Sequence, residues 1–445
     1  MDAPRIVVTP PGPRAREVVE EDSRLIMQSF SRWYPLVVKE ASGVVVEDVD
    51  GNRYLDFNSG LVVVNVGHRH PRVVEAVKRQ VDKLIHYSLT DFYYEEAVRA
   101  ARVLLEISPI EDGKVFYTNS GAESIEGAIK VARGHSRGSR PYIIAFLGAF
   151  HGRTMGAMSV SASKPVHRRG FYPLVPHIIH VPYPYTYRCP FGELEERECG
   201  EAVIGYIEEW VFKRLVDPSE VAAFLVEPIQ GEGGYIVPPD NFLPLLQSLA
   251  RRHGILLALD EVQTGFGRTG EWFAAQHWGV EPDLMAAAKG IAGGLPLGAI
   301  VGRREVMDLP PGSHANTFGG NPIALAAMMA VVEAIREEDM LSNARRVGGE
   351  IMKRLREMGE EIELIGDVRG KGLMIGVELV RDRSTKEPAK KELARVLEES
   401  FKRGLLVVGS GESVVRIAPP LSITMEQAMA GLDILEEVLR DVSRG

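Results

Sequence analysis

Cysteine is nearly absent from the 445 residues of this sequence, which contains only Cys189 and Cys199. The two have neither the spacing of a metal site nor the density of a small disulfide scaffold, so no metal site is predicted. Residues 1–13 hold one short apolar run, which is too short for the core of a secretion signal. These features favour a cytoplasmic protein. Asn and Gln, fifteen in all, are also scarce, which favours a thermophilic source.

Long apolar runs and an excess of basic residues are missing as well. The most apolar long stretch is interrupted by Lys289, Gly293, Gly294 and Pro296, which excludes a membrane span. The formal net charge is −9, so nucleic acid is not an expected partner. The length predicts two domains, or one large domain with a smaller one.

Two short apolar runs, each followed by polar residues, organise the middle of the sequence. Residues 255–259 lead into Asp260 and Glu261, and residues 284–288 lead into Lys289. Runs of about five apolar residues bounded by glycine or charge predict strands that are buried on both faces of a parallel sheet. Because ligands bind at the carboxyl ends of strands in open α/β sheets, we expect these polar residues to face a binding site.

A strand that leads directly into a helix is the second feature. Residues 115–117 predict the strand, and apolar residues at helical spacing from Ile125 to Ala132 predict the helix. Ser120, Gly121 and Ala122 then lie at the helix N-terminus, where unpaired N–H groups and the helix dipole favour an anion. The alternative is an ordinary capped helix start.

The lysine and the two acids also have an explanation without function. A lysine beside an apolar run commonly extends its ammonium group to water, and acids after a strand commonly open a loop or a helix. The two runs together, followed by the glycine-rich residues 290–298, favour a functional site.

The stretch DEVQTGFGRTG, residues 260–270, together with Lys289 resembles the class III aminotransferases, a family of enzymes that depend on pyridoxal phosphate. The resemblance implies that Lys289 forms a Schiff base with the cofactor and that Asp260 keeps the pyridine nitrogen protonated. It also implies that Gln263 binds the phenolic oxygen of the ring, and that the anion-binding turn holds the cofactor phosphate.

Further family motifs surround these residues. In FHGRT, residues 150–154, the resemblance implies that Phe150 stacks on the cofactor ring with His151 beside it. It implies that Arg153 contacts a substrate carboxylate, and the alternative is an unpaired surface arginine. Glu227 and Glu232, in VEPIQGEGG, match acids near the cofactor.

Three more positions bear on the substrate and on assembly. Arg416, in VVRIAPPL, matches an arginine that pairs with the acid at Glu232 and can turn to a substrate α-carboxylate. Thr317 matches a threonine that reaches the cofactor phosphate of the neighbouring subunit, which implies a homodimer; the alternative is a plain turn built on residues 319–322. Leu61 stands where ornithine enzymes typically carry tyrosine and 4-aminobutyrate enzymes an aliphatic residue.

The resemblance covers residues 30–440 and implies the α/β fold class of fold type I. We expect an arm and small meander over residues 1–60 that packs with the small domain, a large cofactor-binding domain over 61–325 and a smaller α/β domain over 326–445. The large domain should hold a mostly parallel sheet flanked by helices. Residues 163–198 lack helical periodicity and predict a long irregular segment, for which the sequence indicates no role.

The expected function is transfer of an amino group from an ω-amino acid, 4-aminobutyrate or similar, to 2-oxoglutarate in two half-reactions at one site. Ornithine aminotransferase is one alternative, and a broad-substrate amino-acid racemase on the same fold is another that the motifs do not exclude. A dinucleotide-binding protein is disfavoured, because such a fold carries G-x-G-x-x-G immediately after its first strand, and the glycines of GEGG, GIAGG and FGG do not fit that pattern.

Overall fold

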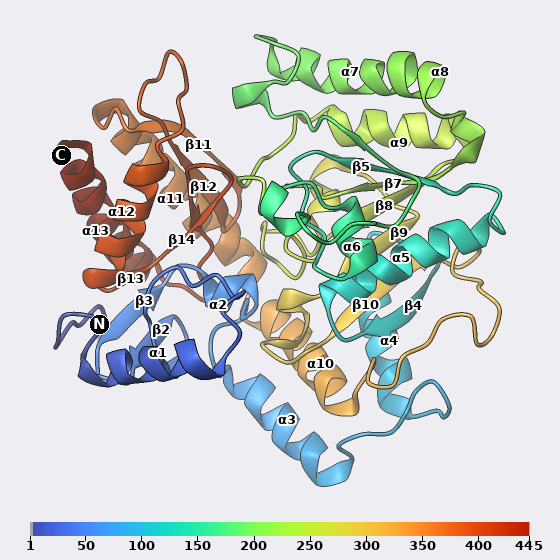
Figure 1. Ribbon diagram of the computed structural model, residues 1–445. Helices are drawn as coiled ribbons and strands as arrows, with labels where there is room; N and C mark the ends of the chain where they lie inside the picture. The colour runs from blue at the N-terminus through green and yellow to red at the C-terminus, as the bar shows by residue number, and fades with distance from the viewer. Residues whose placement is uncertain (1–2, 445) are drawn as a thin grey trace.

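A seven-stranded sheet runs through the computed structural model, which describes residues 3–444 (Figure 1). In spatial order its strands are β4 (Gly113–Thr118), β10 (Gly298–Arg303), β9 (Leu284–Ala287), β8 (Leu256–Asp260), β7 (Val221–Val226), β5 (Tyr142–Phe146) and β6 (Ile178–Val181). Neighbouring strands are parallel except around β10, which is antiparallel to both β4 and β9. The expected mostly parallel sheet is confirmed.

Helices cover both faces of this sheet (Figure 1). The main ones are α5 (Gly121–His135) and α6 (Met155–Val160) on one face, and α7 (Glu196–Tyr206) and α9 (Phe242–His253) on the other. Along β8, Leu257 and Leu259 belong to the apolar cluster that includes α9, whereas Leu256 and Ala258 belong to the cluster that includes α5. The central strands are therefore continuous apolar runs because each of their faces is buried.

A third group of helices packs beside the sheet and against the C-terminal part of the chain. It consists of α3 (Pro71–Lys83), α4 (Glu95–Ile107) and α10 (Pro322–Glu337), with α10 in contact with both of the others. Buried side chains of α10 join the largest apolar cluster, which also includes residues of α4 and of α11. This cluster is continuous from the helices beside the large sheet to the C-terminal part of the molecule.

The N-terminal and C-terminal parts of the chain lie side by side (Figure 1). One small sheet is formed by β1 (Val38–Ser42), β2 (Val45–Asp48), β3 (Arg53–Asp56) and β13 (Leu405–Leu406), and another by β11 (Ile365–Lys371), β12 (Met374–Leu379), β15 (Val414–Ile417) and β14 (Val408–Ser410). The C-terminal helices are α11 (Met340–Glu361), α12 (Lys390–Lys402) and α13 (Met425–Arg444). The N-terminal arm is thus tied to the C-terminal region by the parallel pairing of β3 with β13. The exact domain boundaries stay a prediction.

The segment expected to be irregular, residues 163–198, contains two features that the sequence did not indicate. β6 adds a strand to the edge of the large sheet, and Cys189 forms a disulfide with Cys199 on α7. The remaining helices are α1 (Pro13–Leu25), α2 (Ser59–Val62) and α8 (Phe212–Arg214).

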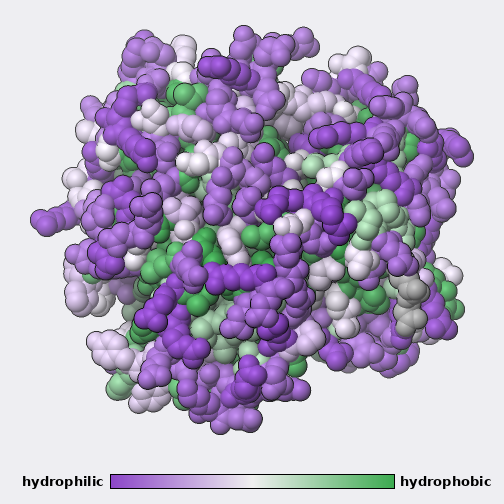
Figure 2. Space-filling view, turned by 180° about the vertical axis from the view of Figure 1, so that it is seen from behind, coloured by the Kyte–Doolittle hydropathy of each residue, from purple (hydrophilic) through white to green (hydrophobic). Residues whose placement is uncertain are grey.

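The surface bears on possible partners. Seen from behind, the molecule is largely hydrophilic, with some apolar side chains near the middle of that face (Figure 2). Within residues 3–444, no helix is both long enough and apolar enough to cross a bilayer. Over the same residues, His, Cys, Asp and Glu side chains form no group that could hold a metal ion.

Candidate active site

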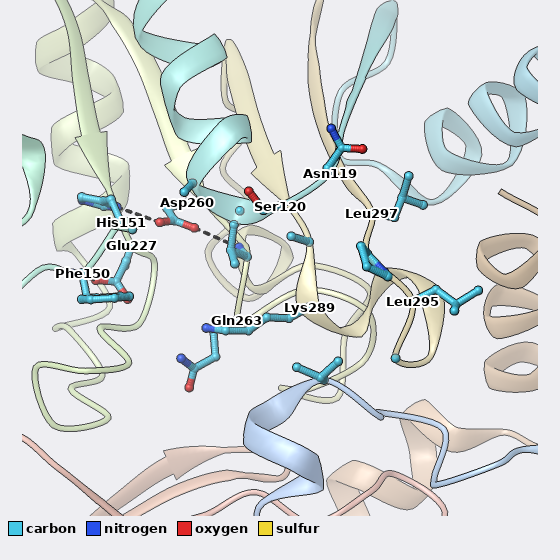
Figure 3. A pocket seen from close by; sticks show the side chains of 18 residues that line it. Asn119, Ser120, Phe150, His151, Glu227, Asp260, Gln263, Lys289, Leu295 and Leu297 are labelled. Carbon is cyan, nitrogen blue, oxygen red and sulfur yellow. Dashed lines mark hydrogen bonds and ion pairs between the residues drawn. The ribbon is translucent and has the colours of Figure 1, made fainter. Parts of the chain in front are cut away.

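A cavity of about 330 Å³ lies at the carboxyl ends of β8 and β9 (Figure 3). Nine residues singled out in the sequence line it: Ser120, Gly121, Ala122, Phe150, His151, Glu227, Asp260, Gln263 and Lys289. They come from five separate segments that meet at one edge of the sheet. The other nine lining residues, which were not among the predicted site residues, are Val63, Asn119, Gly152, Val262, Ala288, Gly294, Leu295, Pro296 and Leu297.

Asp260, the last residue of β8, is held on two sides. Its Oδ1 accepts the backbone N–H of Val262 at 3.0 Å, and its Oδ2 lies 2.7 Å from Nδ1 of His151. Both side chains are buried. Burial lowers the pKa of His151, but the hydrogen bond and the charge of Asp260 outweigh burial, so that this pKa is raised. The pair fixes the direction of a buried carboxylate at the cavity wall.

Glu261, the acid next to Asp260, has a structural role. Its carboxylate accepts the backbone N–H groups of Ala274 at 3.0 Å and Ala275 at 2.8 Å, and it also binds the hydroxyl of Thr264. Burial raises the pKa of Glu261 to about 7. Of the two acids at the carboxyl end of β8, only Asp260 lines the cavity.

Lys289 follows β9 and extends into the cavity (Figure 3). Its backbone φ is 45°, in the left-handed region that residues other than glycine rarely adopt. Such conformations persist where the surrounding structure fixes them, and they cluster at functional sites. Burial lowers the pKa of Lys289, and the charge of Arg416 acts in the same direction, against Asp260. The environment therefore favours the neutral amine, which is the form that acts as nucleophile or base.

The start of α5 forms the opposite wall. Ser120 is the N-cap residue, and its Oγ accepts the N–H of Glu123 at 3.2 Å. Glu123 in turn accepts the N–H of Asn119 at 2.7 Å. A Cβ on Gly121 would lie only 2.8 Å from Val262 Cγ1, so glycine is needed for this close packing. The N–H groups of Gly121 and Ala122, at the start of the helix, have no carbonyl acceptors within it, and they suit an anion.

Glu227 joins two loops of the site. Its carboxylate accepts the backbone N–H of Phe150 at 2.9 Å and that of Gly231 at 2.8 Å. The side chain is 5% exposed. Burial raises the pKa of Glu227 to about 7, against the opposing charge of His151. Glu227 thus connects the loop of Phe150 with the loop of Glu232.

Glu232 lies between two cations. Its Oε2 forms an ion pair with Arg416 on β15, and its Oε1 accepts from Lys164 Nζ at 2.7 Å. Burial raises the pKa of Glu232, but the two cations outweigh burial and the net pKa is below its ordinary value. Arg416 is buried, and its Nε has no hydrogen-bond partner in the described part of the chain. The charges of Arg416 and Glu232 both act on Lys289. The pair therefore lies within electrostatic reach of the cavity.

Like Glu232 and Arg416, three more predicted residues do not line the cavity of the single chain. Arg153 is exposed, and its guanidinium lies 5.3 Å from the centre of the Phe150 ring. Thr317 lies on an exposed loop. Leu61 is 49% exposed and belongs to a turn in which Ser59, Gly60, Leu61 and Val62 all have positive φ.

That turn is a short left-handed helix. The N–H of Val63 donates to the carbonyl of Ser59 at 3.0 Å, and Asn58 Oδ1 accepts from the N–H of Leu61 at 2.6 Å. Left-handed conformation costs about 1–2 kcal/mol for each residue with a Cβ. The turn is adjacent to the lining residue Val63, so the strain is located beside the site.

Comparison with known proteins identifies the family. A model of the class III aminotransferases matches residues 27–439. The chain belongs to the class III aminotransferases. It is 43% identical to an alanine/serine racemase of Pyrococcus horikoshii, over 100% of this chain and 94% of the relative. It is 39% identical to a 4-aminobutyrate aminotransferase of Mycobacterium leprae, over 98% of each chain. The structure of an amine transaminase from an uncultivated Pseudomonas species, in its form with bound pyridoxal phosphate, superposes with a TM-score of 0.88 at 31% identity, over 94% of this chain and 98% of the other.

The chain is therefore a pyridoxal-phosphate-dependent enzyme of fold type I, and the cavity suits that cofactor. A helix start is available for a phosphate, a flat aromatic side chain for a ring face, and a buried carboxylate for a ring nitrogen. Oε1 of Gln263 is buried without a hydrogen-bond partner among residues 3–444, so this amide is available to a ligand. The buried lysine amine of Lys289 lies in the same cavity.

Lys164 is the main contact that the sequence did not indicate. It lies within the segment 163–198, and it reaches Glu232 across 68 positions of the chain. A lone lysine in a proline-rich segment carries no local pattern. Its position became evident only from the folded structure.

Proposed function

We propose that the protein is an aminotransferase that takes an amino group from an ω-amino acid such as 4-aminobutyrate and passes it to 2-oxoglutarate. The observation that carries the proposal is the Glu232–Arg416 ion pair within electrostatic reach of Lys289. An enzyme with these two substrates has to accept one molecule without a carboxylate on the reacting carbon and one molecule with it. An arginine that is paired in one case and released in the other meets both requirements.

The residues of the cavity have distinct roles in this proposal. Pyridoxal phosphate, when bound, supplies a ring that takes up the electrons left behind when a proton leaves the substrate carbon. Lys289 holds the cofactor and then moves that proton as a general base and acid. Asp260, oriented by His151, would hold the ring nitrogen, and Gln263 would hold the phenolic oxygen. Phe150 would stack on the ring, and the first turn of α5 would hold the phosphate.

The carboxylate groups of the substrates are assigned to two arginines. Arg153, exposed beside Phe150, takes the distant carboxylate of 4-aminobutyrate or 2-oxoglutarate. Arg416 stays with Glu232 while 4-aminobutyrate is bound, and turns to the α-carboxylate of 2-oxoglutarate. Leu61, an aliphatic side chain two positions before the lining residue Val63, favours this donor over ornithine.

We further propose a homodimer in which Thr317 reaches the phosphate site of the neighbouring subunit. Two observations support it. Thr317 is exposed and does not line the cavity of its own chain. Its neighbour Phe318 is 61% exposed, so that an apolar side chain of the same loop is available to a second subunit. The cytoplasmic location expected from the sequence stays a prediction.

Amino-acid racemisation is the second candidate. The observation in its favour is that the racemase of Pyrococcus horikoshii is more similar to this chain than the 4-aminobutyrate aminotransferase of Mycobacterium leprae. A racemase uses the same lysine and aspartate, but returns the proton to the substrate carbon from either face. Glu232 is an unsuitable second base in the resting structure, because both of its oxygens are bound to cations.

Product analysis separates the two candidates. The cofactor-loaded protein is incubated with 4-aminobutyrate and 2-oxoglutarate, and separately with L-alanine alone, with the Lys289→Ala variant as the inactive control. The proposal predicts equal amounts of L-glutamate and succinic semialdehyde in the first reaction. D-alanine in the second reaction without glutamate in the first would establish the racemase instead.

A further inference from the structure

Lys164 has a fixed position at the edge of the site. It lies in a segment whose backbone is tied to the loop of Phe150, because Ala162 donates to the carbonyl of Ala149 at 2.8 Å and accepts from the N–H of Gly148 at 3.0 Å. Beyond the lysine, the ring of His167 packs edge-on against Phe150, with 5.5 Å between the ring centres. The first part of the segment 163–198 therefore packs against the loop that carries the lining residue Phe150.

The lysine and the arginine bind different oxygens of one carboxylate. Lys164 holds Oε1 of Glu232, and Arg416 holds Oε2. The side chain of Glu232 is 20% exposed and that of Arg416 5% exposed, whereas Lys164 is 34% exposed. Because the lysine and the arginine do not compete for the same oxygen, either can leave while the other remains.

The contact with Lys164 lowers the free-energy cost of releasing Arg416 from Glu232. An ion pair that loses one buried partner leaves the other charge uncompensated, which is strongly unfavourable. When Arg416 turns away from Glu232, the carboxylate keeps a charge-assisted hydrogen bond to Lys164. Without this lysine, Glu232 would be left in a largely buried position with no cation beside it, and the arginine would be retained more tightly.

We propose that Lys164 is a specificity-determining positioning residue: it keeps Glu232 paired so that Arg416 is free to bind a carboxylate on the reacting carbon of a substrate. The inference rests on the proposed exchange of Arg416 between Glu232 and substrate. It predicts an asymmetric effect. Substrates such as 2-oxoglutarate and L-glutamate depend on Lys164, whereas 4-aminobutyrate, for which Arg416 stays with Glu232, does not.

The test compares Lys164→Gln with Lys164→Arg, which keeps the positive charge. Lys213→Gln serves as a matched control, because Lys213, on α8, forms an exposed ion pair with Glu209 and neither residue lines the cavity. The two half-reactions of the holoenzyme are measured separately, one with 4-aminobutyrate and one with 2-oxoglutarate. Calorimetry gives the affinities for glutarate, which has two carboxylates, and for butyrate, which has one. These two ligands do not react.

Lys164→Gln should raise the KM for 2-oxoglutarate and weaken glutarate binding by about tenfold, the effect of one charge-assisted hydrogen bond on a partly exposed group. The KM for 4-aminobutyrate and the affinity for butyrate should stay within roughly twofold, as should all values for Lys164→Arg and Lys213→Gln. In a Glu232→Gln background, Lys164→Gln should have no further selective effect, because the carboxylate that it binds is gone.

If Lys164→Gln raised the KM for 2-oxoglutarate and for 4-aminobutyrate equally, the inference would be overturned. Such a result would mean that Lys164 contacts a carboxylate that both substrates carry, or that it supports the fold. Unchanged values for glutarate and 2-oxoglutarate would overturn it as well. A wild-type protein that binds glutarate but does not react with 4-aminobutyrate would contradict the proposed function alone. In that case the glutarate comparison still decides the role of Lys164.

Discussion

The Cys189–Cys199 disulfide should stabilise the fold measurably, and removing it tests a feature that the sequence did not predict. The two cysteines are 10 positions apart. In the chain-entropy model, closing a loop of this size stabilises the native state by about 2.7 kcal/mol. For a chain of 445 residues that unfolds in one step, this corresponds to a loss of about 3 °C in Tm when the bond is absent.

The disulfide also borders a contact between the two parts of the molecule. Arg188, next to Cys189, donates from Nε to Glu378 Oε1 at 2.7 Å, and Glu378 also binds Arg369 at 2.8 Å. Glu378 lies on β12, which pairs with the strand that carries Arg416. Reduction should therefore loosen the part of the segment 163–198 that contacts β12, the strand that pairs with the strand of Arg416.

Thiol titration and calorimetry decide the matter. The unfolded wild-type protein should show no free thiols until a reductant is added, and then two. Reductant should lower the Tm of the wild type and leave that of the Cys189→Ala/Cys199→Ala variant unchanged. Two thiols in the untreated protein, or a wild-type Tm that reductant does not move, would refute the reasoning.

Three further outcomes are expected. Lys289→Ala should keep the fold and bind cofactor without the visible band of the lysine-bound form; full activity in this variant would contradict its assignment. Burial raises the pKa of Glu227 to about 7, above its ordinary value, so the folded protein holds this proton more tightly than the unfolded chain. The resulting stabilisation is present at low pH and is lost as the pH rises through about 7. Thermal unfolding of Glu227→Gln should therefore decline less between about pH 5 and 8 than that of the wild type. Arg268 is fully buried and donates to the carbonyls of Leu373 and Pro419, so Arg268→Lys should destabilise by about 2–3 kcal/mol in denaturant titrations, whereas the exposed Arg356→Lys should stay within about 0.5 kcal/mol.

The central strands and the cavity were predictable because their signals are local. Buried parallel strands such as β7 and β8 are continuous apolar runs, and their carboxyl ends bring Glu227, Asp260 and Lys289 to one edge of the sheet. β6 and β11 were not expected. β6 has four residues, and β11 has the polar sequence IGDVRGK with one buried residue at its start, so neither shows the pattern of a core strand.

Contacts between distant segments were not predictable. Lys164 meets Glu232 across 68 positions, and its role depends on where the segment 163–198 folds back onto the site. The left-handed turn beside the cavity has only one glycine among its four residues, so the sequence lacks the usual signal for positive φ. The Lys164 contact and the left-handed turn both depend on tertiary packing, for which the local sequence carries no signal.

The measurement that tests the central claim most directly is the visible absorption spectrum of the cofactor-loaded protein, recorded while 4-aminobutyrate, L-ornithine or L-alanine is added without any oxo acid. The account predicts that 4-aminobutyrate converts the cofactor to its amine form, that the visible band disappears, and that 2-oxoglutarate restores it. A band that persists with 4-aminobutyrate, and that responds only to α-amino acids while D-amino acid accumulates, would contradict the account and identify racemisation as the activity.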